Sequence, residues 1–372
     1  MADAPRPFRL EVPGASISEL KERLARTRWP DEPPLGPWST GASLAYVQEL
    51  CGYWREKFDW RAWEAKLNAF PQFKAPLHGI DVHFIHVRSP DPKAMPLLLS
   101  HGWPGSVFEF HKLIPLLAPR FHVVAPSLPG YGLSFAPGQR RFGTEDIAAC
   151  FADLMALLDY ERFGAQGGDW GGFISAVLGH RYPDRVTGIH VNLLALRRDA
   201  KVAEPTPEER EYLKQLSHFA SEETGYQWIQ GTKPQTLAFG LTDSPAGLAA
   251  WIAEKFRSWS DCGGVIENAI SRDELLANIS LYWFTGAIGS SFWPYYARRH
   301  GPWPMPDGAT VDVPAAYAAF PKEIVRPPRS LAQKMYPDLR RWTEMPRGGH
   351  FAALEQPGLL ARDVIAFFES LG

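Results

Sequence analysis

An aspartate stands at the centre of the glycine-rich stretch GGDWGG, which follows an apolar stretch and precedes a helix-like one. In a nucleophile elbow, a strand enters a helix through a turn so sharp that the central side chain stands clear of the backbone. Such a turn requires small neighbours, and Gly167, Gly168, Gly171 and Gly172 supply them around Asp169. The alternatives are a glycine-rich turn with a surface aspartate and a phosphate cradle. The cradle is disfavoured because neither G-x-G-x-x-G nor G-K-S/T fits this stretch.

A carboxylate at the elbow changes which reactions are sensible. Attack by serine on an sp3 carbon would leave an ether that water cannot readily cleave, whereas attack by Asp169 leaves an ester that an activated water can cleave. The aspartate therefore indicates alkyl transfer from a strained or activated carbon. Epoxides and alkyl halides are the obvious electrophiles.

A second segment, HGWPGS, ends a strand-like run and can face the elbow. We predict that the backbone N–H groups of Trp103 and Trp170 form an oxyanion hole, in which the loss of one donor typically costs on the order of 10²–10³ in rate. The alternative is a turn that merely ends a strand.

The second half of such a reaction needs a base, and the sequence PRGGHFAALEQP offers His350 after two glycines and before a helix-like run. In an α/β-hydrolase, the acidic partner of the histidine lies between nucleophile and base in the chain. Glu323, after a strand-like run, fits this place and would hold the imidazole tautomer. Spacing alone leaves several competitors open: Asp199, Asp312, Asp338 and Glu344.

The elements that must position these side chains follow an alternating pattern. Apolar runs ended by turn residues predict strands within 79–89, 95–100 and 121–127, and helix-like segments cover 106–118 and 144–160. Near the N-terminus, 16–27 is helix-like and opens on a serine that can cap it. Alternating strands and helices are typical of an α/β protein with a mostly parallel sheet flanked by helices.

From about Arg197 the alternation stops. Three helix-like stretches, 204–216, 244–259 and 271–284, follow one another without intervening strands, which predicts a helical insertion. Strand character returns within 309–320 and 339–345, and an amphipathic helix over 358–371 closes the chain.

Composition limits the classes of ligand. The 372 residues are 45% hydrophobic with a formal net charge of −2, which gives no electrostatic footprint for nucleic acid or an anionic membrane. Cys51, Cys150 and Cys262 are too few and too scattered for a disulfide framework or a zinc site. No signal peptide or membrane-spanning run is visible, so we predict a cytoplasmic protein without a membrane anchor.

The motifs HGWPGS, GGDWGG, GYQWIQGTKP, SPAGLAAWIAEKF, LYWFTGAIGSS, AFPKE and GGHFAALEQP occur in this order, and with them the chain resembles microsomal-type epoxide hydrolases of the α/β-hydrolase fold. The resemblance spans nearly all of the chain. It implies an epoxide hydrolase N-terminal region over 1–77 that looks meander-like, a hydrolase core over 78–196 and 311–372, and a helical lid over 197–310.

The resemblance also implies the roles of individual residues. Asp169 would be the nucleophile, His350 the base and Glu323 its acidic partner. Two lid tyrosines of the family hold and protonate the epoxide oxygen; by motif, Tyr226 matches one of them and Tyr295 the other, although the adjacent Tyr296 leaves the second assignment open.

The implied reaction converts a small hydrophobic epoxide and water to a vicinal diol, without metal or organic cofactor. Its expected biological settings are detoxification and aromatic hydrocarbon catabolism, and a homodimer is compatible with the sequence. Aromatic residues in the predicted lid suggest an apolar pocket for aryl or long aliphatic epoxides. They are Trp228, Trp251, Trp283, Phe284, Phe292 and Trp293.

Two other functions remain open from the sequence. A haloalkane dehalogenase looks similar, because it also uses an aspartate nucleophile, often followed by a tryptophan that cradles halide; Trp170 therefore does not discriminate. A non-catalytic α/β-hydrolase scaffold could bind a hydrophobic ligand or a partner protein.

Overall fold

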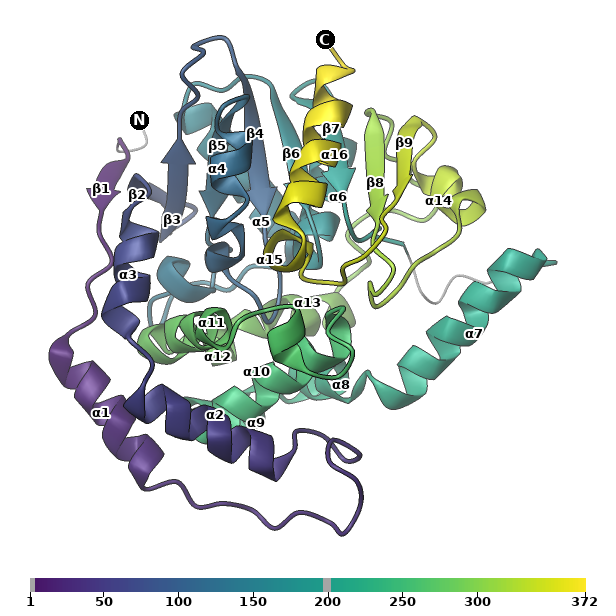
Figure 1. Ribbon diagram of the computed structural model, residues 1–372. Helices are drawn as coiled ribbons and strands as arrows, with labels where there is room; N and C mark the ends of the chain where they lie inside the picture. Colours follow the sequence, from purple (N-terminus) through teal and green to yellow (C-terminus); the bar gives the residue numbers. More distant parts are fainter. Residues whose placement is uncertain (1–3, 197–201) are drawn as a thin grey trace.

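The centre of the protein is one nine-stranded sheet (Figure 1). The computed structural model describes residues 4–196 and 202–372. The strand order is β1-β2-β3-β5-β4-β6-β7-β8-β9. The strands are β1 (Arg6–Phe8), β2 (Gln72–Leu77), β3 (Ile80–Val87), β4 (Met95–Ser100), β5 (Phe121–Pro126), β6 (Phe163–Gly167), β7 (Val186–Val191), β8 (Ala315–Ala319) and β9 (Leu339–Glu344).

All neighbouring strands from β5 to β9 run parallel, whereas β1, β2, β3 and β5 pair antiparallel. Leu97 in the central strand β4 pairs with Val123 on one side and with Gly164 on the other. The apolar runs of β4 and β5 are buried because helices cover both faces of the sheet. The predicted mostly parallel sheet is confirmed.

Helices flank the sheet on both faces: α5 and α6 lie on one, and α4, α15 and α16 on the other (Figure 1). Short 3₁₀ turns occur within the connections. The α-helices and 3₁₀ turns of this part of the chain are η1 (Val107–His111), α4 (Ile114–Leu117), η2 (Gly132–Ser134), α5 (Thr144–Leu157), α6 (Trp170–Arg181), α14 (Arg329–Met335), α15 (Ala352–Glu355) and α16 (Pro357–Glu369).

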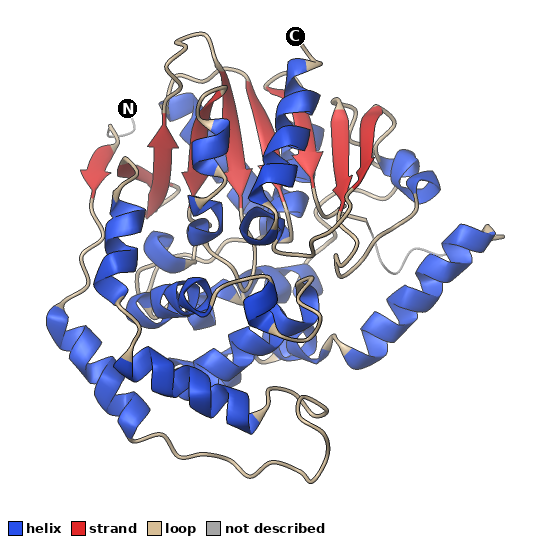
Figure 2. Cartoon of the chain, in the orientation of Figure 1, coloured by secondary structure: helices blue, strands red, loops and turns tan. Residues whose placement is uncertain are grey.

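Between β7 and β8 the described chain is helical. Apart from α7, which projects to one side, these helices form a layer across the carboxyl ends of the parallel strands (Figures 1 and 2). They are α7 (Pro207–Glu222), α8 (Gly225–Thr232), α9 (Pro234–Asp243), α10 (Pro245–Trp259), η3 (Ile266–Asn268), α11 (Arg272–Thr285), α12 (Ile288–Ser291) and α13 (Trp293–His300). Loops at the carboxyl ends of parallel strands are where α/β proteins place their sites.

The N-terminal helices α1 (Gly14–Ala25), α2 (Leu44–Glu56) and α3 (Trp60–Asn68) connect to this helical layer. The Tyr53 hydroxyl donates to Asp273 Oδ1 at 2.9 Å, and Trp54 Nε1 donates to Ser280 Oγ at 3.0 Å. Trp54 is buried. The N-terminal region therefore fixes α11 from the side opposite the sheet.

Two local predictions are wrong. Helix α1 begins at Gly14 rather than after a capping serine, because Pro13 precedes it with φ −55° and its carbonyl accepts from the Ser16 N–H at 3.0 Å. The segment 106–118 is not one helix: it splits into η1 and α4. The Ser106 hydroxyl accepts from the Phe108 N–H, which closes a tight turn instead of an α-helical one.

None of the helices within 4–196 and 202–372 combines the length and the hydropathy needed to cross a membrane.

Candidate active site

Asp169 occupies the turn between β6 and α6, with φ 48° and ψ −127°. Non-glycine residues rarely adopt a positive φ, so the surrounding structure must enforce this backbone conformation. Close packing explains the neighbouring glycines: a Cβ at Gly171 would lie 1.8 Å from the Ser100 carbonyl oxygen, and one at Gly102 would lie 2.2 Å from Asp169 Oδ1. The turn thus pushes the carboxylate out over the carboxyl end of β4.

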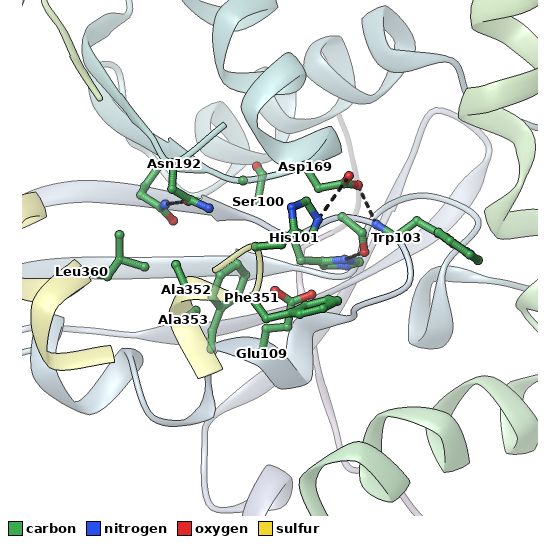
Figure 3. A pocket seen from close by; sticks show the side chains of 15 residues that line it. Ser100, His101, Trp103, Glu109, Asp169, Asn192, Phe351, Ala352, Ala353 and Leu360 are labelled. Carbon is green, nitrogen blue, oxygen red and sulfur yellow. Dashed lines mark hydrogen bonds and ion pairs between the residues drawn. The ribbon is translucent and has the colours of Figure 1, made fainter. Parts of the chain in front are cut away.

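Each oxygen of the Asp169 carboxylate has its own neighbour. The Trp103 backbone N–H donates to Oδ1 at 2.8 Å (Figure 3). The other oxygen, Oδ2, lies 3.5 Å from His350 Nε2. Among the described residues, the Trp170 N–H makes no hydrogen bond to this carboxylate. Of the two predicted oxyanion-hole donors, the Trp103 N–H is therefore the one that the structure places in contact with Asp169.

His350 lies between two carboxylates. Its Nδ1 is 2.6 Å from Glu323 Oε1, which also accepts from the Ile324 N–H at 2.7 Å. Both side chains are buried. Burial opposes the charged imidazolium, but the negative charges of Glu323 and Asp169 and their hydrogen bonds outweigh it, so the pKa of His350 lies well above its usual value.

The loop that carries His350 is tied to the end of α10. The His350 N–H donates to the Trp259 carbonyl at 2.9 Å, and the Gly348 N–H donates to Asp261 Oδ2 at 2.9 Å. The Trp259 ring stands edge-on to the imidazole, with centroids 5.1 Å apart. The helical layer therefore helps to set the position of the imidazole.

The competing acids are placed elsewhere. Asp338 pairs with Arg340 at 2.8 Å, Glu344 accepts from Trp342 Nε1 at 2.7 Å, and Asp312 is exposed. Asp199 lies outside the described residues. Of the four described candidates, Glu323 is the one in contact with His350.

The two motif tyrosines face each other across the site. Tyr226 stacks on Trp103 with ring centroids 5.2 Å apart, and Tyr295 stands edge-on to Trp170 at 4.8 Å. The two phenol rings are 5.7 Å apart, and both are buried. Burial raises the pKa of Tyr295 well above its usual value, so its phenol stays protonated. The Tyr226 hydroxyl accepts from Gln227 Nε2 at 2.8 Å.

Tyr296 lies differently from Tyr295. It is half-buried, and its ring stacks on His300 at 4.0 Å and on Trp293 at 4.9 Å. Tyr295 is thus the member of this pair that contacts the tryptophan next to Asp169.

Most of the six aromatic residues that the sequence suggested as the lining of a pocket lie away from Asp169. Of those six, Phe292 contacts Trp103, at 6.3 Å. The ring contacts of four others are with different partners: Trp228 with Arg299, Trp283 with Arg23, Phe284 with Trp60 and Trp293 with Tyr296. The fifth, Trp251, donates to Gln230 Oε1. The rings gathered around the carboxylate are instead Trp103, Trp170, Tyr226, Trp259, Phe292 and Tyr295.

Comparison with known proteins identifies the family. A family model described as the epoxide hydrolase N terminus matches residues 5–110, and one described as the alpha/beta hydrolase fold matches residues 95–223. The rabbit (Oryctolagus cuniculus) protein named epoxide hydrolase 1 is 39% identical, over 97% of this chain and 88% of that protein. This chain belongs to the epoxide hydrolase family.

Solved structures agree with this assignment. The juvenile hormone epoxide hydrolase of the silkworm Bombyx mori superposes with a TM-score of 0.88 at 33% identity, over 100% of this chain and 95% of that one. The Aspergillus niger epoxide hydrolase gives 0.87 at 30% identity, over 100% and 97%. The predicted α/β-hydrolase fold and the predicted enzyme class are confirmed, and epoxide hydrolysis is favoured over the dehalogenase and non-catalytic alternatives.

Two residues at the site of this epoxide hydrolase were not predicted from the sequence. Glu109 lines a small cavity beside Asp169 and His350, yet in the sequence it looks like a solvated charge on a helix-like segment. Trp259 contacts both His350 and Tyr226, but it is one of 14 tryptophans. Neither residue carries a sequence signal that would have singled it out.

Within the part of the chain that the structure describes, no group of three or more His, Cys, Asp or Glu side chains has the arrangement of a metal site.

Proposed function

We propose that this epoxide hydrolase opens hydrophobic epoxides through a covalent ester on Asp169. The observation that carries the proposal is the pair of contacts at the carboxylate: Trp103 N–H on Oδ1 and His350 Nε2 facing Oδ2. A carboxylate held in this way has one oxygen hydrogen-bonded to a backbone donor, which leaves the other oxygen for attack on the substrate.

In the first step, Tyr226 and Tyr295 donate hydrogen bonds to the epoxide oxygen while Asp169 Oδ2 attacks a ring carbon from the back. The new C–O bond forms as the ring C–O bond breaks, and the leaving alkoxide takes a proton from a phenol. Two protonated phenols suit this role because a neutral donor can stabilise the developing negative charge.

In the second step, His350 removes a proton from a water whose oxygen attacks the carbonyl carbon of the ester. The oxyanion forms at Oδ1, where Trp103 already donates and where Trp170 would be the second donor. Collapse of this intermediate breaks the bond between the carbonyl carbon and the alkyl oxygen, and the imidazolium returns its proton to that oxygen. The second proton of the water, left on the regenerated carboxyl group, returns to the phenolate, so the products are the vicinal diol, the free carboxylate and the neutral phenol.

Formation of the ester prepares His350 for this role. The negative charge of Asp169 is one cause of the raised pKa of His350, and the ester is neutral. Alkylation therefore lowers the pKa of His350 and favours the neutral imidazole that a general base requires. Glu323 keeps the tautomer with the free electron pair on Nε2.

Heavy-oxygen water separates this route from direct attack by water on the epoxide. In a single turnover, we expect the label in the Asp169 carboxylate and none in the first diol released, because water attacks the ester carbonyl and not the epoxide carbon. Mass spectrometry of the diol and of the Asp169 peptide provides the measurement. Label in the diol and none in Asp169 contradicts the two-step route.

The tyrosine assignment has its own test. Tyr295→Phe is expected to slow alkylation about 100-fold, because the phenol that stabilises the leaving oxygen is lost. Tyr296→Phe, which removes the hydroxyl of the neighbouring ring, should leave alkylation nearly unchanged. Stopped-flow measurement of tryptophan fluorescence with styrene oxide can follow this step. The opposite ranking of the two variants would move the second proton donor to Tyr296.

The proposal also includes four predictions from the sequence that go beyond membership of the family. They are aryl or long aliphatic epoxides as substrates, a role in detoxification and aromatic hydrocarbon catabolism, a cytoplasmic location and a homodimer. The division of the chain into an N-terminal region (1–77), a core (78–196 and 311–372) and a lid (197–310) is part of the same proposal. The aromatic rings around Asp169 support the hydrophobic substrate class.

A further inference from the structure

A small cavity lies beside Asp169 and His350 (Figure 3). Its volume is about 20 Å³, which suffices for one water molecule. Phe351, Ala352, Ala353 and Leu360 form an apolar part of its wall. Polar side chains form another part, and the proposed mechanism gives none of them a role: Ser100, Glu109, Gln166 and Asn192.

Two of these polar side chains leave an atom without a partner. Ser100 Oγ and Gln166 Oε1 are buried and have no hydrogen-bond partner among the described residues. Gln166 uses its amide nitrogen to donate to Asn192 Oδ1 at 3.0 Å. A buried polar atom without a partner is costly, and an ordered water is the usual remedy. The cavity therefore has the polar partners that a bound water needs.

Glu109 supplies a third partner. It lies in η1, and its carboxyl group points into the cavity (Figure 3). A Cβ at Gly105 would lie 1.3 Å from Glu109 Oε1, so this position must be glycine for the carboxyl group to fit. The carboxyl group of Glu109 accepts a hydrogen bond from the Ser106 backbone N–H, and in the described part of the chain it makes none to another side chain.

The protonation state of Glu109 suits contact with water. Burial raises its pKa to about 8, with His350 lowering and Asp169 raising it. At neutral pH the group is therefore mainly a neutral acid, which can both donate and accept a hydrogen bond. A neutral group also avoids a second negative charge beside Asp169.

We propose that Glu109 holds the hydrolytic water in this cavity, next to His350 and the ester carbonyl of Asp169. This inference rests on the proposed two-step function. Glu109 neither gains nor loses a proton overall; it fixes the water through a hydrogen bond while His350 takes the proton. Its effect is confined to hydrolysis of the ester, because alkylation uses no water.

Step-resolved kinetics of Glu109→Leu test this role. We expect ester hydrolysis to slow about 100-fold, as for a misplaced reactant, with alkylation nearly unchanged. The alkylated Asp169 peptide should then accumulate during turnover of styrene oxide. Glu109→Gln keeps the hydrogen bond and should stay close to the wild-type rate. The measurements are stopped-flow tryptophan fluorescence and mass spectrometry of the quenched enzyme.

Two further variants keep the test decisive. Glu64→Leu removes another buried glutamate, in α3, and should lower the unfolding temperature without changing the ratio of the two rates. Ser100→Ala removes a second water partner and is expected to slow hydrolysis about tenfold, so it provides a readout even if Glu109→Leu fails to fold. A wild-type hydrolysis rate in Glu109→Leu, or in Ser100→Ala if Glu109→Leu does not fold, overturns the inference. The inference is also overturned if Glu109→Leu and Glu109→Gln each slow alkylation and ester hydrolysis to the same extent.

Failure of this inference is distinguishable from failure of the proposed function. If no adduct forms on the Asp169 peptide of His350→Ala, the covalent route itself is wrong. If that adduct forms and Glu109→Leu hydrolyses it normally, only the water site is wrong.

Discussion

Replacing Asp169 by alanine is expected to lower epoxide turnover by at least about 10⁴-fold, because no other described group is placed to form the ester. The folded state should survive, since the residue lies at a turn and alanine removes only the carboxylate. Diol formation from styrene oxide, measured by chromatography, checks the rate, and thermal unfolding checks the fold.

Asp159 offers a matched control for this variant. It is also an aspartate with positive φ, 63°, but it is exposed, in the loop between α5 and β6. Asp159→Ala should retain full turnover, with at most a small change in stability. Activity of Asp169→Ala within tenfold of wild type would exclude the carboxylate as nucleophile.

The second large effect is expected from His350→Ala. Alkylation needs only an ionised carboxylate and protonated phenols, so the first half-reaction should still occur. Hydrolysis loses its general base, and steady-state turnover is expected to fall by at least about 10³-fold. Intact-mass spectrometry after mixing with excess styrene oxide should show one substrate added per chain, on the peptide that contains Asp169.

His300→Ala serves as the corresponding control, because His300 is exposed and stacks on Tyr296 rather than on the site. It should turn over normally and show no trapped adduct. An unmodified His350→Ala protein, recovered folded, would contradict the covalent route.

The fold could be predicted in outline because the relevant signals are local. The runs at β4 and β5 are apolar and short, and the glycines around Asp169 report a sharp turn whose close contacts exclude side chains. The two wrong predictions also have local causes. The start of α1 depends on Pro13, and η1 depends on a hydrogen bond from the Phe108 N–H to Ser106. Hydrophobic periodicity does not report such single contacts.

The site was only partly predictable for a different reason. Asp169 and His350 carry signals in their glycine-rich neighbours, so the sequence by itself determined the nucleophile and base candidates and the chemistry they suggest. Spacing alone left Glu323 among five candidate acids and Tyr295 beside Tyr296, and the preference for Glu323 and Tyr295 came from the family resemblance. Nothing in the sequence indicated that Glu109 faces a cavity. Only the tertiary structure decided these questions, because they depend on which side chains meet across elements distant in the chain, and a contact between distant segments leaves no periodic or local mark in either segment.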